Sequence, residues 1–396
     1  MNEKQVDILI IGGGLAGAAL HIALTRRGFD CLLIESSPFS NTVQPNFDAR
    51  TLALSPASMR ILQTLKIWPL LEQEVTPIHK IHISEQGRFG KAQLNRKDNQ
   101  PLGYVVEMQH INRAFHQAIN HHSIFAPAQL ISLNKLAPAV AIHYANEQLL
   151  IKAKLIVAAD GSQSKIRQLA NLEQGLKIKD YLQQAIVTNI GLARPHKNDA
   201  YERFTQSGPL ALLPITKQRM SMVWALSPNE ADRISKLTDS AFLAHLQQVF
   251  GYKLGQFKKV GHRTLYPLKQ VIMPNAIAWP LVFIGNAAHT LHPVAGQGFN
   301  LSLRDIAALA QCIVQYGLTS AMLEKYQAMR QYDQQIISRA TNDLVELFTS
   351  KLPGLGCLRS IGLSIFDNSN LLKKILTHHA RGFAGVAPDL VCGIDL

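Results

Sequence analysis

The chain has 396 residues, of which 47% are hydrophobic and 17% charged, so its composition is globular and excludes a disordered or fibrous protein. The 40 Lys and Arg residues exceed the 27 Asp and Glu residues and give a formal net charge of +13, which favours acidic partners such as a membrane surface or a phosphate-bearing cofactor. Because the basic residues are scattered and carry no interleaved aromatic stacking motif, we expect no nucleic-acid partner.

The sequence predicts neither a metal site nor a membrane span. Its four cysteines form no CxxC pair, so neither metal-ligand spacing nor a disulfide framework is expected. The N-terminus enters a strand without a basic and apolar leader, which predicts no signal peptide. The least polar long stretch, residues 271–288, is interrupted by Pro274, Pro280 and Gly285 and is predicted as a buried strand with its flanks. We therefore expect a cytoplasmic protein, open to peripheral contact with the inner face of the cytoplasmic membrane.

The first 35 residues predict a βαβ unit. Residues 6–11 form a short apolar run typical of a parallel strand that is buried on both faces. Residues 15–27 place apolar side chains at helical spacing and end at Gly28, and residues 30–35 form a second buried strand. Such a unit predicts a Rossmann-like sheet.

A glycine-rich turn joins the first strand to the first helix and fits the pattern GxGxxG. It comprises Gly12, Gly14, Leu15, Ala16 and Gly17. Its glycines let the backbone approach a pyrophosphate, which the free N–H groups of the helix N-terminus attract. Glu35, at the end of the second strand, would bond ribose hydroxyls and repel a 2′-phosphate, which argues against NADP here. The turn predicts a dinucleotide site and leaves FAD and NAD open.

Two later strands end in similar turns. Residues 155–159 lead into Asp160 and Gly161, and residues 281–284 lead into Gly285 and Asn286. The second of these turns continues through Pro293 to Gly296, Gln297, Gly298, Phe299 and Asn300, where a helix begins. A glycine-rich turn that feeds a helix binds anions or oxygen atoms and would suit a flavin ring or its ribityl chain. The alternative is that these are two unrelated strand ends.

The remaining segments indicate an insertion and a helical end. Residues 180–269 contain alternating apolar stretches separated by turn residues, which predicts mostly antiparallel strands, and a shorter piece at 78–84 is expected to join that sheet. From Asn300 to about residue 376 the pattern is helical.

These motifs together carry a family resemblance. The set consists of GxGxxG, Asp48-Ala49-Arg50 with Ala53-Leu54-Ser55, Asp160-Gly161, the run GNAAHTLHPVAGQGFNLSLRD from Gly285, YERF at 201–204, GPLALLP at 208–214, Trp224, and Tyr326 with Arg330 and Asp333. It resembles the single-component flavin hydroxylases typified by p-hydroxybenzoate hydroxylase, and within them most of all the ubiquinone-biosynthesis hydroxylases. The resemblance runs from residue 7 to about residue 382.

The resemblance implies a place on the cofactor for each motif. The ADP half of FAD would be held by Gly12, Gly14, Gly17 and Glu35. Arg50 would lie near the pyrophosphate and Gln109 near the flavin. Asp160 would serve both FAD and the nicotinamide donor, and the isoalloxazine would be lined by Pro293 and Gly296–Asn300. Asn286 departs from the family, most of which has Asp bonding the ribityl hydroxyls. An amide still donates and accepts hydrogen bonds there. Gly-Asn also resembles the branch that hydroxylates 2-polyprenyl-6-methoxyphenol.

The domain organisation follows from the same resemblance. Residues 1–75, 101–179 and 270–330 are predicted to form the FAD-binding domain, 76–100 and 180–269 an inserted, mostly antiparallel substrate domain, and 331–396 a C-terminal helical region.

The implied reaction is hydroxylation of an aromatic ring through a flavin hydroperoxide, most simply conversion of 2-polyprenyl-6-methoxyphenol to the 1,4-benzoquinol. It uses O2 as co-substrate and NAD(P)H or another reductant as electron donor. The implied partners are a lipid-tailed phenol and a ubiquinone-biosynthesis complex. The alternatives are a sister hydroxylase for another ring position, a pyridine-nucleotide dehydrogenase, an isoprenoid reductase or epoxidase, and a flavin-bearing assembly subunit without turnover.

Several further residues have two interpretations. His289, His292 and Pro293 lie on the predicted flavin loop as catalytic candidates, although both histidines would equally serve packing. Arg203 and Trp224 either face the substrate or are ordinary sheet residues. For Tyr326, Arg330 and Asp333, which share one helical face, a structural ion-pair network is preferred. Residues 352–366 form an apolar stretch followed by a basic cluster, which either contacts anionic lipid or packs on its own domain.

Overall fold

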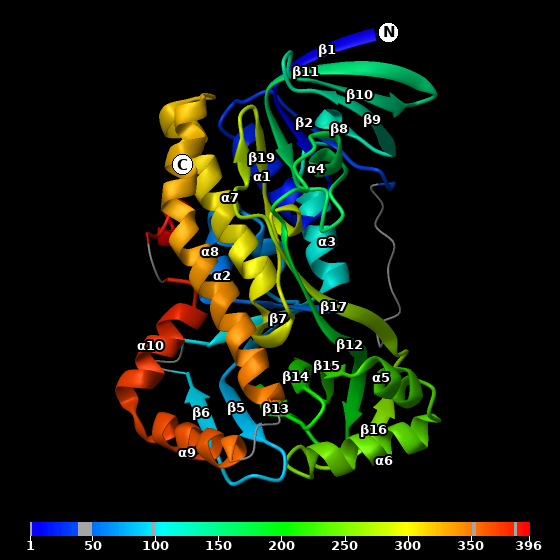
Figure 1. Cartoon of the computed structure of the whole chain (residues 1–396), viewed down its shortest axis with the longest axis vertical. Helices are drawn as coiled ribbons and strands as arrows, with labels where there is room; N and C mark the ends of the chain where they lie inside the picture. The colour runs from blue at the N-terminus through cyan, green and yellow to red at the C-terminus, as the bar shows by residue number, and fades with distance from the viewer. Residues whose placement is uncertain (1, 39–49, 97–99, 351–353, 384–385) are drawn as a thin grey trace.

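The computed structural model describes residues 2–38, 50–96, 100–350, 354–383 and 386–396. Its elements are arranged as two large sheets stacked along the long axis of the molecule, with α8 (Ser320–Thr349) running beside both (Figure 1). Of the motif named above, Asp48 and Ala49 lie outside the described residues.

The first sheet is mostly parallel, in the order β18-β19-β11-β1-β2-β8. Its strands are β1 (Asn2–Ile11), β2 (Cys31–Ile34), β8 (Ile124–Phe125), β11 (Glu147–Ala158), β18 (Ile277–Ala278) and β19 (Leu281–Phe283), extended by β9 (Ala128–Asn134) and β10 (Ala139–Tyr144). β1 pairs in parallel with both β2 and β11, and β11 pairs in parallel with β19. Ile8, Leu9 and Ile10 are fully buried, which explains why β1 has no alternation of polar and apolar residues.

Both faces of this sheet are covered. One carries α1 (Leu15–Thr25), α2 (Pro56–Thr64), α3 (Met108–Ala118) and α7 (Gln297–Tyr316), joined in one apolar cluster. The other carries β9, β10 and α4 (Lys165–Leu169), joined in a second cluster. A small sheet of β3 (Thr51–Leu54), β7 (Gly103–Glu107) and β4 (Val75–Ile78) lies between the two large sheets (Figure 1).

The second large sheet is mostly antiparallel, in the order β20-β17-β12-β15-β14-β13-β5-β6, with β16 also pairing with β12. Its strands are β5 (Lys80–Glu85), β6 (Lys91–Asn95), β12 (Lys177–Leu192), β13 (Asp199–Phe204), β14 (Pro209–Thr216), β15 (Arg219–Leu226), β16 (Phe257–Val260), β17 (Thr264–Ile272) and β20 (His289–Thr290). Its outer face packs on α5 (Pro228–Ser235) and α6 (Asp239–Phe250). The chain ends in α9 (Leu355–Asn368), α10 (Asn370–Ala380) and α11 (Asp389–Cys392).

This architecture confirms the predicted fold class: a Rossmann-like part, an inserted and mostly antiparallel sheet, and a helical C-terminal region. The prediction of a single buried strand with flanks at 271–288 was too coarse. That segment holds the end of β17, the short strands β18 and β19, and the 3-10 turn η3 (Gly285–Ala287). The exact domain boundaries remain our proposal. In the described part of the chain, no helix has the length and apolarity needed to cross a bilayer.

Candidate functional site

The turn between β1 and α1 is closely packed on one side and open on the other. A Cβ atom at Gly12, where φ is +109°, would lie 2.4 Å from the carbonyl oxygen of Ala159, and one at Gly17 would lie 2.0 Å from the oxygen of Gly12. No atom lies within 4 Å of the Cβ position of Gly14, the N-cap of α1. Only glycine fits at the two packed positions, and the open side leaves a space at a helix N-terminus.

The three strand-end turns meet. A Cβ atom at Gly285, at the start of η3, would lie 3.0 Å from the Cβ of Ala16 in α1. Arg167 in α4 donates to the carbonyl oxygens of Ala287 (2.8 Å) and Ser162 (2.6 Å), so it ties the turn after β11 to the turn after β19. The predicted convergence of these distant turns is therefore observed.

The turn before α7 is held by one amide. The Asn300 side chain accepts from Ser55 N (2.8 Å) and Ser58 Oγ (2.7 Å) and donates to the oxygens of Ala53 (2.9 Å) and Gly296 (2.7 Å). Its side-chain hydrogen bonds thus fix the turn against β3 and α2, and any contact with a ligand falls to its backbone. This η4 turn (Val294–Gly296) keeps Gly296 left-handed, with φ +59°.

Unpartnered polar atoms and open positions around the turns show which ligand chemistry would fit there. The Oδ2 atom of Asp160 accepts from Ile166 N (3.1 Å), whereas its buried Oδ1 atom has no hydrogen-bond partner among the described residues. No atom lies within 4 Å of a Cβ at Gly298. Glu35 accepts from the Gly13 N–H (2.6 Å) and so reaches the glycine-rich turn. An extended ligand with phosphates, ribose and a polar ring fits this set.

The other predicted cofactor residues lie in several elements. Leu15 and Ala16 open α1, and Gly161 follows Asp160 with φ +82°. Pro293 precedes the η4 turn, and Gln297 and Phe299 lie in the first turn of α7. Asn286 is exposed in η3. The Nη1 atom of Arg50 lies 3.4 Å from Tyr266 Oη. Gln109, at the start of α3, donates a hydrogen bond to Glu107 (2.8 Å).

The two histidines of this loop have different environments. His289 is buried and bonds Asp305 through Nε2 (2.5 Å), and Asp305 in turn binds Arg330 (2.6 Å). His292 is also buried, and its Nδ1 accepts from the Val294 N–H (3.1 Å), which places the proton of the neutral ring on Nε2. Burial lowers the pKa of His292 to about 4. His289 is therefore part of an ion network, whereas His292 offers a neutral N–H donor without a partner among the described residues.

The predicted ion-pair network is confirmed. Arg330 bridges Asp305 (2.6 Å) and Asp333 (2.6 Å), and Arg304 binds Asp333 (2.9 Å), all of them buried. Although burial opposes ionisation of Asp305, Arg330 and His289 outweigh it and lower its pKa to about 2. The network ties α7 to α8 directly behind the flavin-loop strand β20.

Comparison with known proteins decides what this site holds. The family model described as FAD binding domain matches residues 5–340. The chain belongs to this family. It is 32% identical to ubiquinone hydroxylase UbiL of Rhodospirillum rubrum, over all of this chain and 94% of that protein, and 29% identical to 3-demethoxyubiquinol 3-hydroxylase of Escherichia coli, over 96% and 100%.

A solved structure shares the fold. The crystal structure of p-nitrophenol 4-monooxygenase PnpA from Pseudomonas putida superposes with a TM-score of 0.76 at 14% identity, covering 96% of this chain and 99% of that one. The protein is an FAD-dependent monooxygenase of the ubiquinone-biosynthesis hydroxylase group. The dinucleotide left open by the first motif is FAD.

In this hydroxylase the inner face of the second sheet looks toward the flavin turns. The Tyr181 ring of β12 lies 4.9 Å from the ring of His292, and Tyr266 of β17 lies within reach of Arg50. Tyr181 belongs to an apolar cluster with Ala185 and Ala225, the small residues of this face.

A row of paired residues crosses this inner face. Glu202 pairs with Ala211, Ala211 with Val223, and Val223 with Val187. All four are only partly buried, although their strands lie within the sheet. The outer face of the same strands is closed by α5 and α6. The inner face is therefore partly exposed along a row of small and apolar side chains that includes one carboxyl group.

Of the two interpretations of Arg203 and Trp224, the structure supports ordinary sheet residues. Trp224 belongs to the buried cluster under α5 and α6 and stacks on His245 (5.7 Å), so it faces away from the flavin turns. Arg203 shares that outer face and donates to Val249 O (3.0 Å). Their neighbour Glu202 was missed. Arg203 pairs with Leu210 and Leu210 with Trp224, so these three share one face. Since successive strand residues point to opposite faces, Glu202 lies on the inner face.

Glu202 has the properties of a proton acceptor. Its Oε1 atom is buried and has no hydrogen-bond partner in the described ranges. Burial raises the pKa of Glu202 to about 7. A carboxyl group that ionises near neutrality among small and apolar side chains is suited to general acid–base chemistry.

Proposed function

We propose that this hydroxylase adds oxygen to the aromatic ring of a polyprenylated phenol in ubiquinone biosynthesis, converting 2-polyprenyl-6-methoxyphenol to the 1,4-benzoquinol. The main support is the convergence of the three strand-end turns opposite a sheet face of small and apolar residues. UbiL and the 3-demethoxyubiquinol hydroxylase, both matched over nearly their full length, support the pathway. Asn286 supports the choice of ring position, because the Gly-Asn pair resembles the branch that hydroxylates 2-polyprenyl-6-methoxyphenol.

Within this proposal the turns hold the cofactor. Gly12, Gly14 and Gly17 would admit the pyrophosphate to the N-terminus of α1, and Glu35 would exchange its bond to Gly13 N for ribose hydroxyls. Bound FAD, reduced by NAD(P)H or another donor, supplies the activation of O2. The assigned set comprises Arg50 near the pyrophosphate, Gln109, Asp160 and Gly161, Gly285 and Asn286 at the ribityl chain, and Pro293 to Asn300 at the ring.

The chain's own groups prepare the phenol. The apolar inner face would exclude water and hold the ring, and the N–H of His292 would donate a hydrogen bond at the flavin side. Glu202 would accept the phenol proton, which makes the ring electron-rich. His289, held by Asp305, would position the loop and take no part in proton transfer.

Deletion of the gene in its host tests the reaction. We expect a 2-polyprenyl-6-methoxyphenol to accumulate, identified by mass spectrometry of extracted quinones, and the restored gene to remove it. Accumulation of a demethoxyubiquinol would move the assignment to the ring position of the Escherichia coli relative. Unchanged quinone would overturn the biosynthetic role.

Glu202→Gln is expected to lower kcat about 100-fold with FAD affinity unchanged, since general bases typically contribute 10²–10⁴-fold. Wild-type kcat/KM should rise with pH up to about 7, where the carboxyl ionises, and the variant should lose that dependence. The matched control is Glu173→Gln, at an exposed position. A variant that keeps the wild-type rate and pH profile would exclude Glu202 as the base.

Stability gives an independent measurement on the same variant. The pKa of Glu202 is raised in the folded state, so ionisation in the unfolded chain destabilises the fold as pH rises from about 4.5 to 7. Glu202→Gln should therefore raise the thermal midpoint at pH 8 and leave it nearly unchanged at pH 4. An equal change at both pH values would mean that packing, and not charge, sets the effect.

We further infer contact with the inner face of the cytoplasmic membrane through α9 and α10, and assembly with other proteins of ubiquinone biosynthesis. α10 carries Lys373, Lys374, His378 and His379, and Leu371 is 67% exposed on the same helix. A lipid-tailed phenol lies in a membrane, so the enzyme must reach it there.

A further inference from the structure

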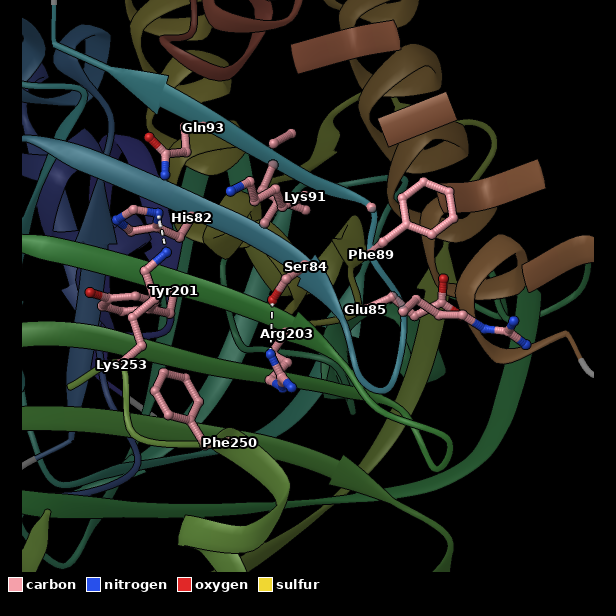
Figure 2. A pocket seen from close by; sticks show the side chains of 14 residues that line it. His82, Ser84, Glu85, Phe89, Lys91, Gln93, Tyr201, Arg203, Phe250 and Lys253 are labelled. Atoms are coloured by element: carbon pink, nitrogen blue, oxygen red, sulfur yellow. Dashed lines mark hydrogen bonds between the residues drawn. The ribbon is translucent and has the colours of Figure 1, made fainter. Parts of the chain in front are cut away.

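A cavity of about 230 Å³ opens on the outer side of the second sheet, where β5, β6 and β13 meet the end of α6 (Figure 2). Tyr201 and Phe250 form aromatic walls, with ring centroids 5.4 Å apart. Four cationic side chains line it: Arg88, Lys91, Arg203 and Lys253. It lies on the face opposite to Glu202 and has no part in the hydroxylation proposed above.

The four cations of this cavity form no direct ion pair in the described part of the chain, although Asp199 attracts Lys253 at longer range. Across residues 2–38, 50–96, 100–350, 354–383 and 386–396, no ion pair joins any of the four cations to a carboxylate. Arg203 donates only to neutral groups, Val249 O (3.0 Å) and Ser84 Oγ (3.3 Å), and burial lowers its pKa. Lys253 contacts the Nδ1 atom of His82 (3.0 Å), and burial together with Lys91 lowers its pKa. An anion placed here would restore the lost solvation.

The carboxylates nearest the cavity are already engaged. Glu85 lines it but is paired with Arg359 of α9 (3.1 Å to Nε). Asp199 is bonded to Nε2 of His82 (3.2 Å). Burial and Lys253 lower the pKa of His82, so it is a neutral ring near pH 7.

The cavity continues into an apolar surface. Phe89, 68% exposed, lines both the cavity and a shallow groove along α9 formed with Ile361 and Ile365. Figure 2 shows Phe89 between the basic side chains and the ribbon of α9. α9 packs directly on this turn, because a Cβ atom at Gly90 would lie 2.4 Å from Ser360 Cα.

The apolar surface extends over both C-terminal helices. The following large hydrophobic residues are exposed there: Leu358, Ile361, Ile365, Leu371, Leu372, Ile375 and Leu376. Basic residues flank it at the end of α10. An exposed apolar patch beside a cavity with four cationic side chains matches a molecule with an anionic head and apolar chains.

We propose that the cavity binds the phosphate headgroup of an anionic phospholipid whose acyl chains lie on the exposed face of α9 and α10. Arg203 and Lys253 bind the phosphate from the sheet side, Lys91 and Arg88 from the rim, and Phe89 separates head from chains. This site specifies the membrane contact inferred above and is independent of the reaction.

Flotation of the purified holoenzyme with vesicles of phosphatidylglycerol or phosphatidylcholine tests the site. We expect binding to phosphatidylglycerol vesicles only. Arg203→Gln/Lys253→Gln should weaken it at least 10-fold, because each basic group near an anionic surface contributes to binding. The control Lys217→Gln/Lys258→Gln removes the same charge from the β14–β15 turn and β16, and should stay within about twofold. Flavin absorbance of each variant reports that the protein is folded.

Two further measurements distinguish a lipid headgroup from a soluble phosphate as the bound anion. Ile361→Ser/Ile365→Ser should also lose vesicle binding while glycerol 1-phosphate still raises the thermal midpoint of that variant. If glycerol 1-phosphate binds but vesicles do not, the cavity takes a soluble phosphate and the lipid proposal is overturned. Equal losses in the pocket and control variants would overturn it too, since diffuse charge would then explain binding. Vesicle binding by a protein that fails to restore quinone synthesis would reject the proposed reaction alone.

Discussion

A Gly14→Asp variant is expected to fold as well as the wild type and to purify without flavin. Gly14 is the N-cap of α1, with φ −63° and ψ 175°, a conformation open to any residue. No atom lies within 4 Å of its Cβ position, and no side chain caps the helix. An aspartate would cap α1 and stabilise it by about 1 kcal/mol. Its carboxylate would occupy the place of the pyrophosphate and repel it.

The measurement is FAD affinity by fluorescence titration of the apoprotein, together with thermal unfolding. We expect at least a 100-fold weaker Kd for the variant and an unfolding midpoint equal to or above that of the wild-type apoprotein. Gly14→Ser, a neutral cap at the same position, should weaken binding much less. A yellow Gly14→Asp protein with wild-type affinity would show that the phosphates do not approach this helix.

The sequence predicts the flavin turns well because their glycines are required by local geometry. Gly12 and Gly17 leave no room for a side chain, and such constraints appear directly as residue types at fixed spacing. The strands behind them are apolar on both faces, so a continuous apolar run is sufficient to detect them. The convergence of the turns after β11 and β19 also followed, because parallel strands of one sheet end at the same edge.

The second sheet was less predictable. Its alternation shows that two faces differ, but not which face meets the flavin, and that choice depends on where α5 and α6 pack. The two interpretations of Trp224 therefore stayed open, and Glu202 was missed. The prediction for residues 271–288 was too coarse for a related reason: the end of β17, two short strands and a turn share one apolar stretch, and only tertiary pairing separates them.

The cationic cavity had no sequence signal at all. Arg88 and Lys91 lie on one hairpin, whereas Arg203 and Lys253 come from segments more than 100 residues away. In the sequence each is a single basic residue among 40, and only the pairing of β13 with β5 gathers them. The apolar stretch in the C-terminal region was visible, but its exposure was not.

Arg330→Met is expected to destabilise the protein by about 3–5 kcal/mol, the cost of removing one partner from a buried ion pair. It would leave Asp305 and Asp333 sharing only Arg304 and His289 in a site closed to water. Chemical unfolding of the holoenzyme at pH 7 measures the loss. The control, Lys236→Met, breaks the exposed pair with Asp232 and should cost less than about 1 kcal/mol.

The pH dependence distinguishes loss of charge compensation from loss of packing. Since the folded pKa of Asp305 is lowered to about 2, its contribution to stability is complete above about 3.8 and is lost as pH falls toward 2. Without Arg330 the burial of that carboxyl raises its pKa, so acid unfolding of the variant should begin at higher pH. A stability loss that stays constant from pH 7 to pH 3 would instead assign the effect of Arg330 to its volume, and the network would then be a packing feature between α7 and α8.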